Sequence, residues 1–407
     1  MNTSVWITGV GVAAPTGLGR DEHWKATVGG ERRLTPITRF DTTGYPSTLA
    51  GQITGFEPAD HIPKRLLPQT DISTRLALVA AAEAIEDARL RPEDTTDYDM
   101  GVVTSNATGG FAFTHREFRK LWHQGPRSVS VYESFAWFYA VNTGQISIRN
   151  GMRGPGSALV ADQAGGLDAI GHARRTVRKG TPIVITGGID SALDPWGYAS
   201  HISSGRISRT ADPARAYLPF SAGPEGHVPG EGGAMLLVES EDGARARGAD
   251  PLAEIAGYAS GFDPEPGTGN PAVLRRVIET ALADAGTGLE DVDVVFADAA
   301  ADPGADAAEA GAIREVFGPG GVPVTAPKAL VGRLGSGGGP LDAATALSAF
   351  AAGSIPPTGT DIEVPGEYGI DLVGARPRPA RLGTALILAR GIRGFTSAVL
   401  LRNNQRN

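Results

Sequence analysis

Residues 157–175 read SALVADQAGGLDAIGHARR, an apolar run that stops at Asp162 and gives way to a helix-like pattern of small residues. A residue at such a strand-to-helix turn points into a cleft, and the helix N-terminus behind it stabilises negative charge. A cysteine or serine would be activated there. This chain has Gln163 instead. Its amide is not a nucleophile at neutral pH, but it can donate and accept hydrogen bonds.

A second segment repeats this pattern. GGLDAIGHARRTVRKG begins at Gly165 and GGPLDAATALSAFAAG begins at Gly338. Each follows an apolar run and a turn, and each has a glycine pair, then Leu-Asp-Ala, then a small-residue helix pattern. Such helices can lie between two sheets, where only small side chains allow close approach. We therefore predict an internal duplication, with halves at 1–240 and 241–407.

The remaining patterns predict a layered α/β fold. Helical periodicity covers 75–90 and 272–286, and the segment 203–232 is rich in loop-forming residues. Apolar runs typical of buried strands lie at 5–10, 100–105, 157–162, 182–188, 233–240, 293–298, 321–326, 384–390 and 397–402. Strands that alternate with helices favour much parallel sheet. For 203–232, composition does not decide between an ordered active-site loop and a plain connection.

The composition excludes several classes of function. The net charge is −8, and neither nucleic acid nor an anionic membrane attracts such a chain. There is no cysteine, which excludes disulfides and thiolate sites, and the seven dispersed histidines indicate no metal site. The first residues lack the pattern of a secretory signal, and no apolar run reaches the roughly 20 residues that span a bilayer. We therefore expect a cytoplasmic protein.

Four stretches resemble the ketosynthase (thiolase-like) superfamily of condensing enzymes. VADQAGG stands where these enzymes carry the motif around a catalytic cysteine. VWITGVGVAAPTGLG, HVPGEGGAMLLVE and GFTSAVLL match the opening strand, the segment leading into the second half, and the closing turn and strand. The resemblance covers essentially the whole chain. It implies a thiolase-like, duplicated five-layered α-β-α-β-α fold.

The resemblance also identifies what this chain lacks. Gln163 replaces the cysteine. Asp298, in ADAAADPGADAAE, replaces the histidine of the family stretch Ala-His-Gly-x-Gly-Thr, and Arg333, in KALVGR, replaces a second histidine, while Asp306 and Glu309 keep their places. Condensation needs a thiolate to hold the acyl chain and neutral imidazoles to stabilise an enolate, which an aspartate would repel. We therefore expect no independent condensing activity, and we expect Asp298 and Arg333 to pair.

One subfamily has glutamine in this motif: the chain length factor, or ketosynthase beta subunit, of bacterial type II aromatic polyketide synthases. GGFAFTHREFRKLW and SVYESFAWFYAVNTGQISIR, within the segment 105–150, resemble it closely. The resemblance implies a heterodimer with a cysteine-containing ketosynthase alpha subunit, in a polyketide synthase complex of antibiotic biosynthesis. It also implies an acyl carrier protein that carries the chain on phosphopantetheine, a tunnel at the interface, and no cofactor of this chain's own.

The stretch FAFTHREFRKLW (111–122) has an apolar face at helical spacing. Phe111, Thr114 and Phe118 lie at i, i+3 and i+7. Spacing alone predicts an ordinary amphipathic helix on the core. The resemblance implies instead that these residues line the end of the tunnel, together with Trp196, so that their bulk limits chain growth. Two phenylalanines and a threonine form a bulky set, which predicts an octaketide.

Two other functions stay open. In the first, the chain is a malonyl carrier protein decarboxylase or priming subunit, in which the amide of Gln163 mimics an acyl thioester; the simpler interpretation is that Gln163 fills an unused pocket. In the second, the chain is a homodimeric protein that binds acyl chains without a catalytic partner.

Overall fold

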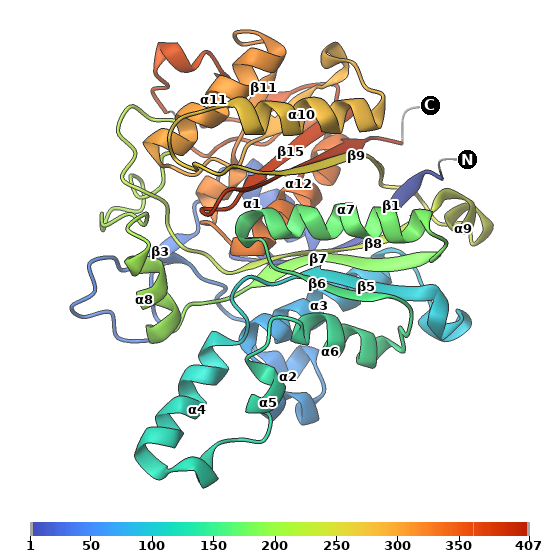
Figure 1. Ribbon diagram of the computed structural model, residues 1–407, viewed down its shortest axis with the longest axis vertical. Helices are drawn as coiled ribbons and strands as arrows, with labels where there is room; N and C mark the ends of the chain where they lie inside the picture. The colour runs from blue at the N-terminus through green and yellow to red at the C-terminus, as the bar shows by residue number, and fades with distance from the viewer. Residues whose placement is uncertain (1–2, 361, 405–407) are drawn as a thin grey trace.

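The computed structural model describes residues 3–360 and 362–404, and its helices and sheet form five layers (Figure 1). The helices of the three helical layers are, from top to bottom of Figure 1, α10 (Ala272–Ala285) and α11 (Pro303–Phe317), then α12 (Gly338–Ala352) and α7 (Gly165–Arg178), then α3 (Ile72–Asp87) and α6 (Val141–Asn150). The layered α/β fold predicted from the sequence is confirmed. No helix in the described ranges combines the length and apolarity that crossing a membrane requires.

The two halves of the sheet have the same strand order. It is β1-β8-β7-β5-β6 in the first half and β9-β16-β15-β10-β11 in the second, and β1 pairs with β9 where the halves meet. The first-half strands are β1 (Val5–Ala14), β5 (Met100–Ser105), β6 (Gly156–Leu159), β7 (Ile183–Asp190) and β8 (Gly232–Ser240); the second-half strands are β9 (Ala253–Phe262), β10 (Val294–Phe296), β11 (Pro323–Thr325), β15 (Thr384–Arg390) and β16 (Phe395–Arg402).

Strand directions repeat as well. The β1–β8 and β9–β16 pairs are antiparallel, whereas β5–β7 and β10–β15 are parallel. This repetition supports a duplicated chain, while the boundary at residue 240 stays a prediction. The other helices and strands are α1 (Arg20–Val28), α2 (Pro58–His61), α4 (Phe111–Gln124), α5 (Glu133–Ala136), α8 (Pro195–Ser203), α9 (Glu241–Ala246), β2 (Gly17–Leu18), β3 (Leu34–Pro36), β4 (Leu49–Gly51), β12 (Ser354–Ile355), β13 (Asp371–Leu372) and β14 (Arg378–Pro379).

The glycine pairs of the two repeated segments lie where α7 and α12 contact each other. A Cβ built on Gly166 would lie 2.1 Å from the carbonyl oxygen of Ser336. A Cβ built on Gly339 would lie 2.7 Å from Cγ of Leu167. No side chain fits at either position, because real atoms do not approach this closely. The glycine pairs repeat in the sequence because the two central helices, α7 and α12, pack closely against each other at these positions.

Among the described strands longer than three residues, the sequence analysis missed one, β9. Its sequence, AEIAGYASGF, is rich in Ala and Gly, which have low β-propensity. These small residues are needed because α10 packs directly on the strand: a Cβ on Gly257 would lie 2.2 Å from the carbonyl oxygen of Ala281. The predicted strands are all present, with ends that differ by a few residues, as helix and strand boundaries commonly do.

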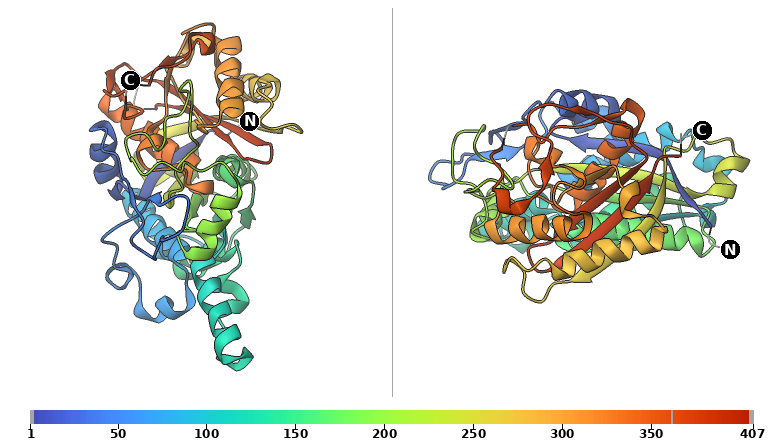
Figure 2. Two further views of the ribbon diagram at one scale, coloured as in Figure 1. Left: turned by 90° about the vertical axis from the view of Figure 1, so that its left-hand side faces the viewer. Right: turned by 90° about the horizontal axis from the view of Figure 1, so that it is seen from above.

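Helix α4 extends away from the rest of the molecule in both Figure 1 and the left view of Figure 2. It confirms the helix expected over 111–122. With the following turn and α5 it forms a projection, residues 111–139, which we call the arm. Trp122 and Val131 on the arm are about four-fifths exposed, at 81% and 80%. Large apolar side chains this exposed indicate a surface that another molecule covers.

Candidate functional site

Gln163 lies at the strand-to-helix turn that the sequence indicates, in a 3-10 turn of residues 162–164 ahead of α7. Its side chain is half-buried, and its Oε1 lies 3.6 Å from the position of a Cβ built on Gly338. Asp162 has a φ of 52°, in the left-handed region that non-glycine residues seldom adopt. Oδ2 of Asp162 accepts a hydrogen bond of 2.8 Å from the backbone N–H of Ile392. The turn therefore has the strained geometry of a nucleophile turn, with an amide in place of the nucleophile.

Asp298 and Arg333 form the ion pair expected from the sequence. Nη2 of Arg333 lies 3.0 Å from both carboxylate oxygens of Asp298, and Nη1 donates to its carbonyl oxygen at 3.0 Å. The two side chains are buried, with 2% and 4% exposure. Burial alone would lower the pKa of Arg333, but Asp298 beside it holds that pKa above its ordinary value. The pair fills the place of the two lost imidazoles with charges that compensate each other.

Two more buried carboxyl groups hold the loop that carries Asp298. Glu309 accepts hydrogen bonds from the backbone N–H groups of Asp298 and Ala299, at 2.6 and 2.8 Å. Asp306 accepts from the N–H groups of Phe220 and Ala301, at 2.8 and 3.1 Å. Burial raises the pKa of Asp306 to about 7: it outweighs the hydrogen bond from Phe220, which lowers that pKa, and the neighbouring Glu309 adds to the rise. These groups act on the backbone of the loop, which explains why they remain although the histidine is gone.

The loop also keeps a backbone geometry that suits glycine. Ala299 and Ala301 both have a φ of 52°. They occupy the two glycine positions of the stretch Ala-His-Gly-x-Gly-Thr, counted from Asp298 at the histidine. A left-handed alanine costs roughly 1–2 kcal/mol. The loop therefore has the backbone conformation expected of the family's histidine-bearing loop, although alanines stand in place of the two glycines that adopt a positive φ without strain.

The segment 203–232, which composition alone left undecided, is ordered and covers this loop. The hydroxyl of Tyr217 donates to the carbonyl oxygen of Ala299 at 2.8 Å. The backbone of Arg333 pairs with it on both sides, donating to Val228 at 2.9 Å and accepting from Gly230 at 2.8 Å. The segment thus holds the Arg333 backbone in place from the first half of the chain.

The three positions that correspond to the cysteine and the two histidines hold neither a thiol nor an imidazole. The chain contains no cysteine, so it cannot hold an acyl group as a thioester at Gln163. Lys328, near Arg333 in the sequence, is paired with Asp342 of α12 at 2.5 Å. Among the described residues, no three His, Asp or Glu side chains gather in a way that would hold a metal ion. The charged groups at these positions are paired with each other or hydrogen-bonded to the backbone.

The structure brings three of the four predicted tunnel residues together. The ring of Trp196 on α8 lies 5.4 Å from that of Phe111, edge to face, and 5.5 Å from that of Phe118. Phe118 and Trp196 are 41% and 43% exposed, so this aromatic cluster is at the surface of the chain. Thr114 is buried and is turned further into the molecule. The interpretation of this helix face as core packing is therefore wrong for Phe118.

Asp190, at the end of β7, is a site residue that the sequence analysis missed. It is buried and accepts hydrogen bonds from the backbone of Ala107 and Thr108, just before α4, at 2.9 and 3.1 Å. It also accepts from the backbone and the hydroxyl of Ser336, just before α12, at 2.7 and 2.8 Å. One carboxylate therefore joins the start of the arm to the central layer. No local pattern in the sequence indicates contacts over such separations.

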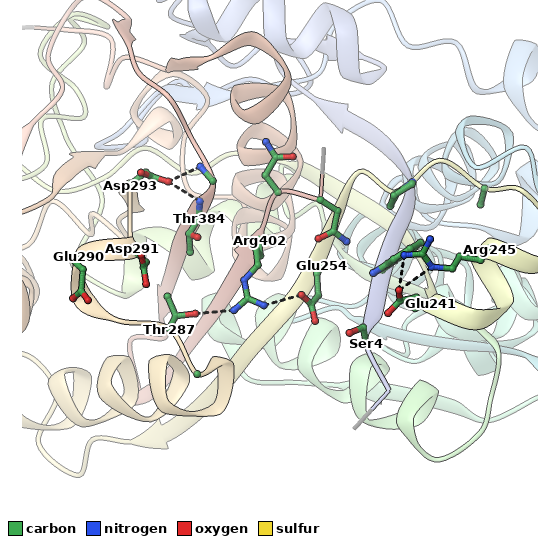
Figure 3. A pocket seen from close by; sticks show the side chains of 17 residues that line it. Ser4, Glu241, Arg245, Glu254, Thr287, Glu290, Asp291, Asp293, Thr384 and Arg402 are labelled. Carbon is green, nitrogen blue, oxygen red and sulfur yellow. Dashed lines mark hydrogen bonds and ion pairs between the residues drawn. The ribbon is translucent and has the colours of Figure 1, made fainter. Parts of the chain in front are cut away.

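Two of the larger cavities among the described residues lie outside this site. One, of about 830 Å³, is lined by charged residues near the starts of β1 and β9 and the end of β16 (Figure 3). Its charges are largely paired within it, as Arg402 is with Glu254 and Arg245 with Glu241, and it contains none of the predicted site residues. The other, of about 590 Å³, lies beside α4 and is lined by basic residues together with Asp194.

Two family models match the chain. The model of the beta-ketoacyl synthase N-terminal domain matches residues 2–244, and that of the beta-ketoacyl synthase C-terminal domain matches residues 252–360. Two curated relatives are similar over nearly their whole length. A beta-ketoacyl synthase 2 assigned to actinorhodin polyketide formation in Streptomyces coelicolor is 66% identical, covering 98% of each chain. The tetracenomycin polyketide synthase ketoacyl synthase beta subunit of Streptomyces glaucescens is 54% identical, again covering 98% of each.

Solved structures give the same result for the fold. The ishigamide ketosynthase/chain length factor superimposes with a TM-score of 0.90 at 26% identity, covering 99% of this chain and 100% of that one. A type II polyketide synthase acyl-carrier protein in complex with its ketosynthase, bound to the hexaketide, gives a TM-score of 0.88 at 25% identity with the same coverage. The thiolase-like fold expected from the sequence is confirmed.

A double-mutant cycle tests the buried ion pair. Asp298→Ala leaves Arg333 charged and unpaired inside the protein, which should cost about 3–5 kcal/mol of unfolding free energy. Adding Arg333→Met should recover much of that loss, because both charges are then gone. The exposed pair Asp371–Arg378 is the control, and Asp371→Ala should cost less than about 1 kcal/mol. Chemical denaturation measures Asp298→Ala, Arg333→Met, the double variant and Asp371→Ala; strictly additive losses at 298 and 333 would rule out the coupling.

The left-handed alanines allow a second stability test. Ala299→Gly removes roughly 1–2 kcal/mol of backbone strain, which offsets about 0.8 kcal/mol for the lost methyl group, so stability should be kept or slightly raised. Ala300→Gly, at the intervening position with no positive φ, should lower stability by about 1 kcal/mol. Equal losses at both positions in thermal denaturation would contradict the strain in this loop.

Proposed function

The chain belongs to the beta-ketoacyl synthase family, among the ketosynthase beta subunits (chain length factors) of type II polyketide synthases, and we propose that it sets polyketide length without catalysing condensation itself. In this proposal a partner ketosynthase supplies the catalytic cysteine. The growing poly-β-ketone passes into a tunnel at the subunit interface and ends against this chain.

One observation carries the proposal: the catalytic positions are filled by a satisfied ion pair, while the bulky aromatic residues lie at the surface. Asp298 and Arg333 leave no group for covalent or enolate chemistry in this chain. Phe111, Phe118 and Trp196 form a cluster that is partly exposed in the isolated chain. Side chains arranged in this way can stop an incoming chain by their bulk and need no chemistry of their own.

The exposed apolar side chains support a large partner interface around β6. This strand is at the end of the sheet order, with its outer edge unpaired by any other described strand. Several large apolar residues on or next to β6, α6 and α5 are at least one-third exposed. They are Val160, Ile148, Trp137, Phe138 and Tyr139. An open strand edge beside such residues suits a permanent subunit contact, of the class that buries roughly 2,000–5,000 Å².

A carrier protein completes the proposed complex. A solved structure of similar fold is named as a type II polyketide synthase acyl-carrier protein in complex with its ketosynthase. We extend this by proposal to the assembly that contains our chain: the carrier protein delivers malonyl units to the partner's cysteine, and this chain receives the far end of the product. The alternative is a homodimer that binds acyl chains without a catalytic partner. It predicts that adding this chain to a ketosynthase, carrier protein and malonyl donor yields no polyketide.

The proposed product is an octaketide. The indole of Trp196 contacts the rings of both Phe111 and Phe118, so in this proposal three large side chains close the end of the tunnel. Thr114 is buried behind them and adds little bulk to the exposed cluster. The longer-chain alternative would need at least one of these rings to turn aside.

Phe118→Ala tests the role of this cluster. Because Phe118 is 41% exposed, its loss should change stability little, and the proposal predicts a polyketide longer than the wild-type octaketide. The matched control is Phe113→Ala on the same helix: Phe113 is 1% exposed, so its loss should cost about 3–5 kcal/mol. The measurement is the product mass from the chain, its ketosynthase partner, carrier protein and a malonyl donor. A stable Phe118→Ala variant that gives only the original length would refute this role of Phe118.

Gln163→Ala separates the proposal from a decarboxylase function. If Gln163 only fills the unused pocket, the purified chain alone should release no carbon dioxide from malonyl carrier protein, and Gln163→Ala should behave identically. The readout is labelled carbon dioxide from malonyl carrier protein over time, with the partner ketosynthase omitted. Release by the wild-type chain that disappears in Gln163→Ala would favour the priming function instead.

A further inference from the structure

Among the described residues, backbone hydrogen bonds fix only the first turn of α4 to the body of the molecule. The N–H of Phe113 donates to Oδ2 of Asp71, at the start of α3, at 2.8 Å. Asp190 holds the two residues 107 and 108 just before the helix. Beyond this turn α4 extends outward (Figure 1). The orientation of its farther turns, including the one that carries Phe118, must therefore be set by side-chain contacts.

On one side these contacts stay within the arm. Glu117 is buried, and it accepts hydrogen bonds from the backbone N–H of Ser130 and from Nζ of Lys120, both at 2.8 Å. Burial alone would raise the pKa of Glu117, but these donors hold it below its ordinary value. Glu117 therefore ties α4 to the turn that follows it, but it does not orient the arm relative to the rest of the chain.

On the opposite side α4 faces α8, and one polar contact joins them. Nδ1 of His115 lies 3.2 Å from Oδ2 of Asp194. His115 is four residues after Phe111 and three before Phe118, so the three side chains share one helix face. Asp194 is the N-cap of α8, because its Oδ1 accepts a hydrogen bond from the N–H of Gly197.

This contact is well placed to control the aromatic cluster. Trp196 is the second residue of α8, two positions after Asp194. One carboxylate therefore holds the start of α8 with one oxygen and the middle of α4 with the other. The Trp196 ring then lies between the two phenylalanine rings of α4. The side chain of Asp194 is 8% exposed and that of His115 is 26%, so the contact is sheltered from water.

We propose that His115 and Asp194 are positioning residues that determine polyketide length by holding Trp196 against Phe111 and Phe118. The inference rests on the proposed function, since it assumes that this cluster ends the tunnel. Neither residue contacts the polyketide. Without their contact the start of α8 and the middle of α4 separate more easily, the aromatic cluster opens, and the tunnel admits a longer chain.

The test compares product lengths from the full complex of this chain, partner ketosynthase, carrier protein and malonyl donor. Asp194→Ser keeps an N-cap oxygen for α8 but is too short to reach His115. His115→Ala removes the other partner. Each variant should raise the ratio of longer to wild-type-length product by about tenfold, the effect of losing one charge-assisted hydrogen bond. The double variant should change the ratio no more than either single variant, because both remove the same contact.

Two controls separate positioning from general loss of structure. Asp194→Asn can keep both hydrogen bonds, so it should keep the wild-type product. His123→Ala changes a histidine on the last turn of α4. It lines, with His115, the cavity of about 590 Å³ beside this helix, and its loss should also leave the product unchanged. A purely structural role would lower the total yield of all products together and would leave the length ratio as it is.

Phe118→Ala, measured in parallel, distinguishes the two levels of the argument. If it lengthens the product while His115→Ala and Asp194→Ser do not, the inference about the contact is overturned and the proposed function stands. If Phe118→Ala also leaves the length unchanged, the proposed function itself fails at this cluster.

Discussion

Two central helices, α7 and α12, approach each other closely at a pair of glycines, and the rest of the molecule is arranged around that contact. A Cβ at Gly166 of α7 would overlap the backbone of Ser336, and a Cβ at Gly339 of α12 would overlap the side chain of Leu167. Each helix begins at a turn that belongs to the candidate site: Gln163 lies just before α7, and Ser336 just before α12. The close contact therefore brings the two halves of the site together. It also explains why the turn geometry has been retained in a chain that has no nucleophile there.

The site shows how the loops around residues 163, 298 and 333 are held where no cysteine or histidine is present. Removing two imidazoles from a buried pocket would leave a cavity and unpaired polar groups, both of which cost stability. Asp298 and Arg333 fill that space with charges that satisfy each other. Glu309 and Asp306 go on holding the loop by its backbone, even where alanine must adopt the left-handed conformation. The retained shape keeps the surface that faces a partner, which is the part that the proposed function needs.

Much of this was accessible from the sequence, and the exceptions have a common cause. The repeated glycine pairs predicted the duplicated fold, and the substitutions at 163, 298 and 333 predicted a site without condensing chemistry, including its ion pair. The strand β9 was missed because its small residues serve helix packing and hide its β-propensity. Asp190 and the contact between His115 and Asp194 join segments about 80 residues apart, and no local periodicity indicates them. The exposure of Phe118 depends on how the arm leaves the body, which helical spacing does not determine.

The central claim is that the growing polyketide ends against this chain, at the aromatic cluster of α4 and α8. The most direct measurement is a crystal or cryo-EM structure of the complex with its ketosynthase partner, trapped with a full-length acyl chain on the partner's cysteine. The account predicts that the far end of the acyl chain lies in van der Waals contact with Phe111, Phe118 and Trp196. An acyl chain that ends wholly within the partner, or that turns toward Gln163, would contradict it.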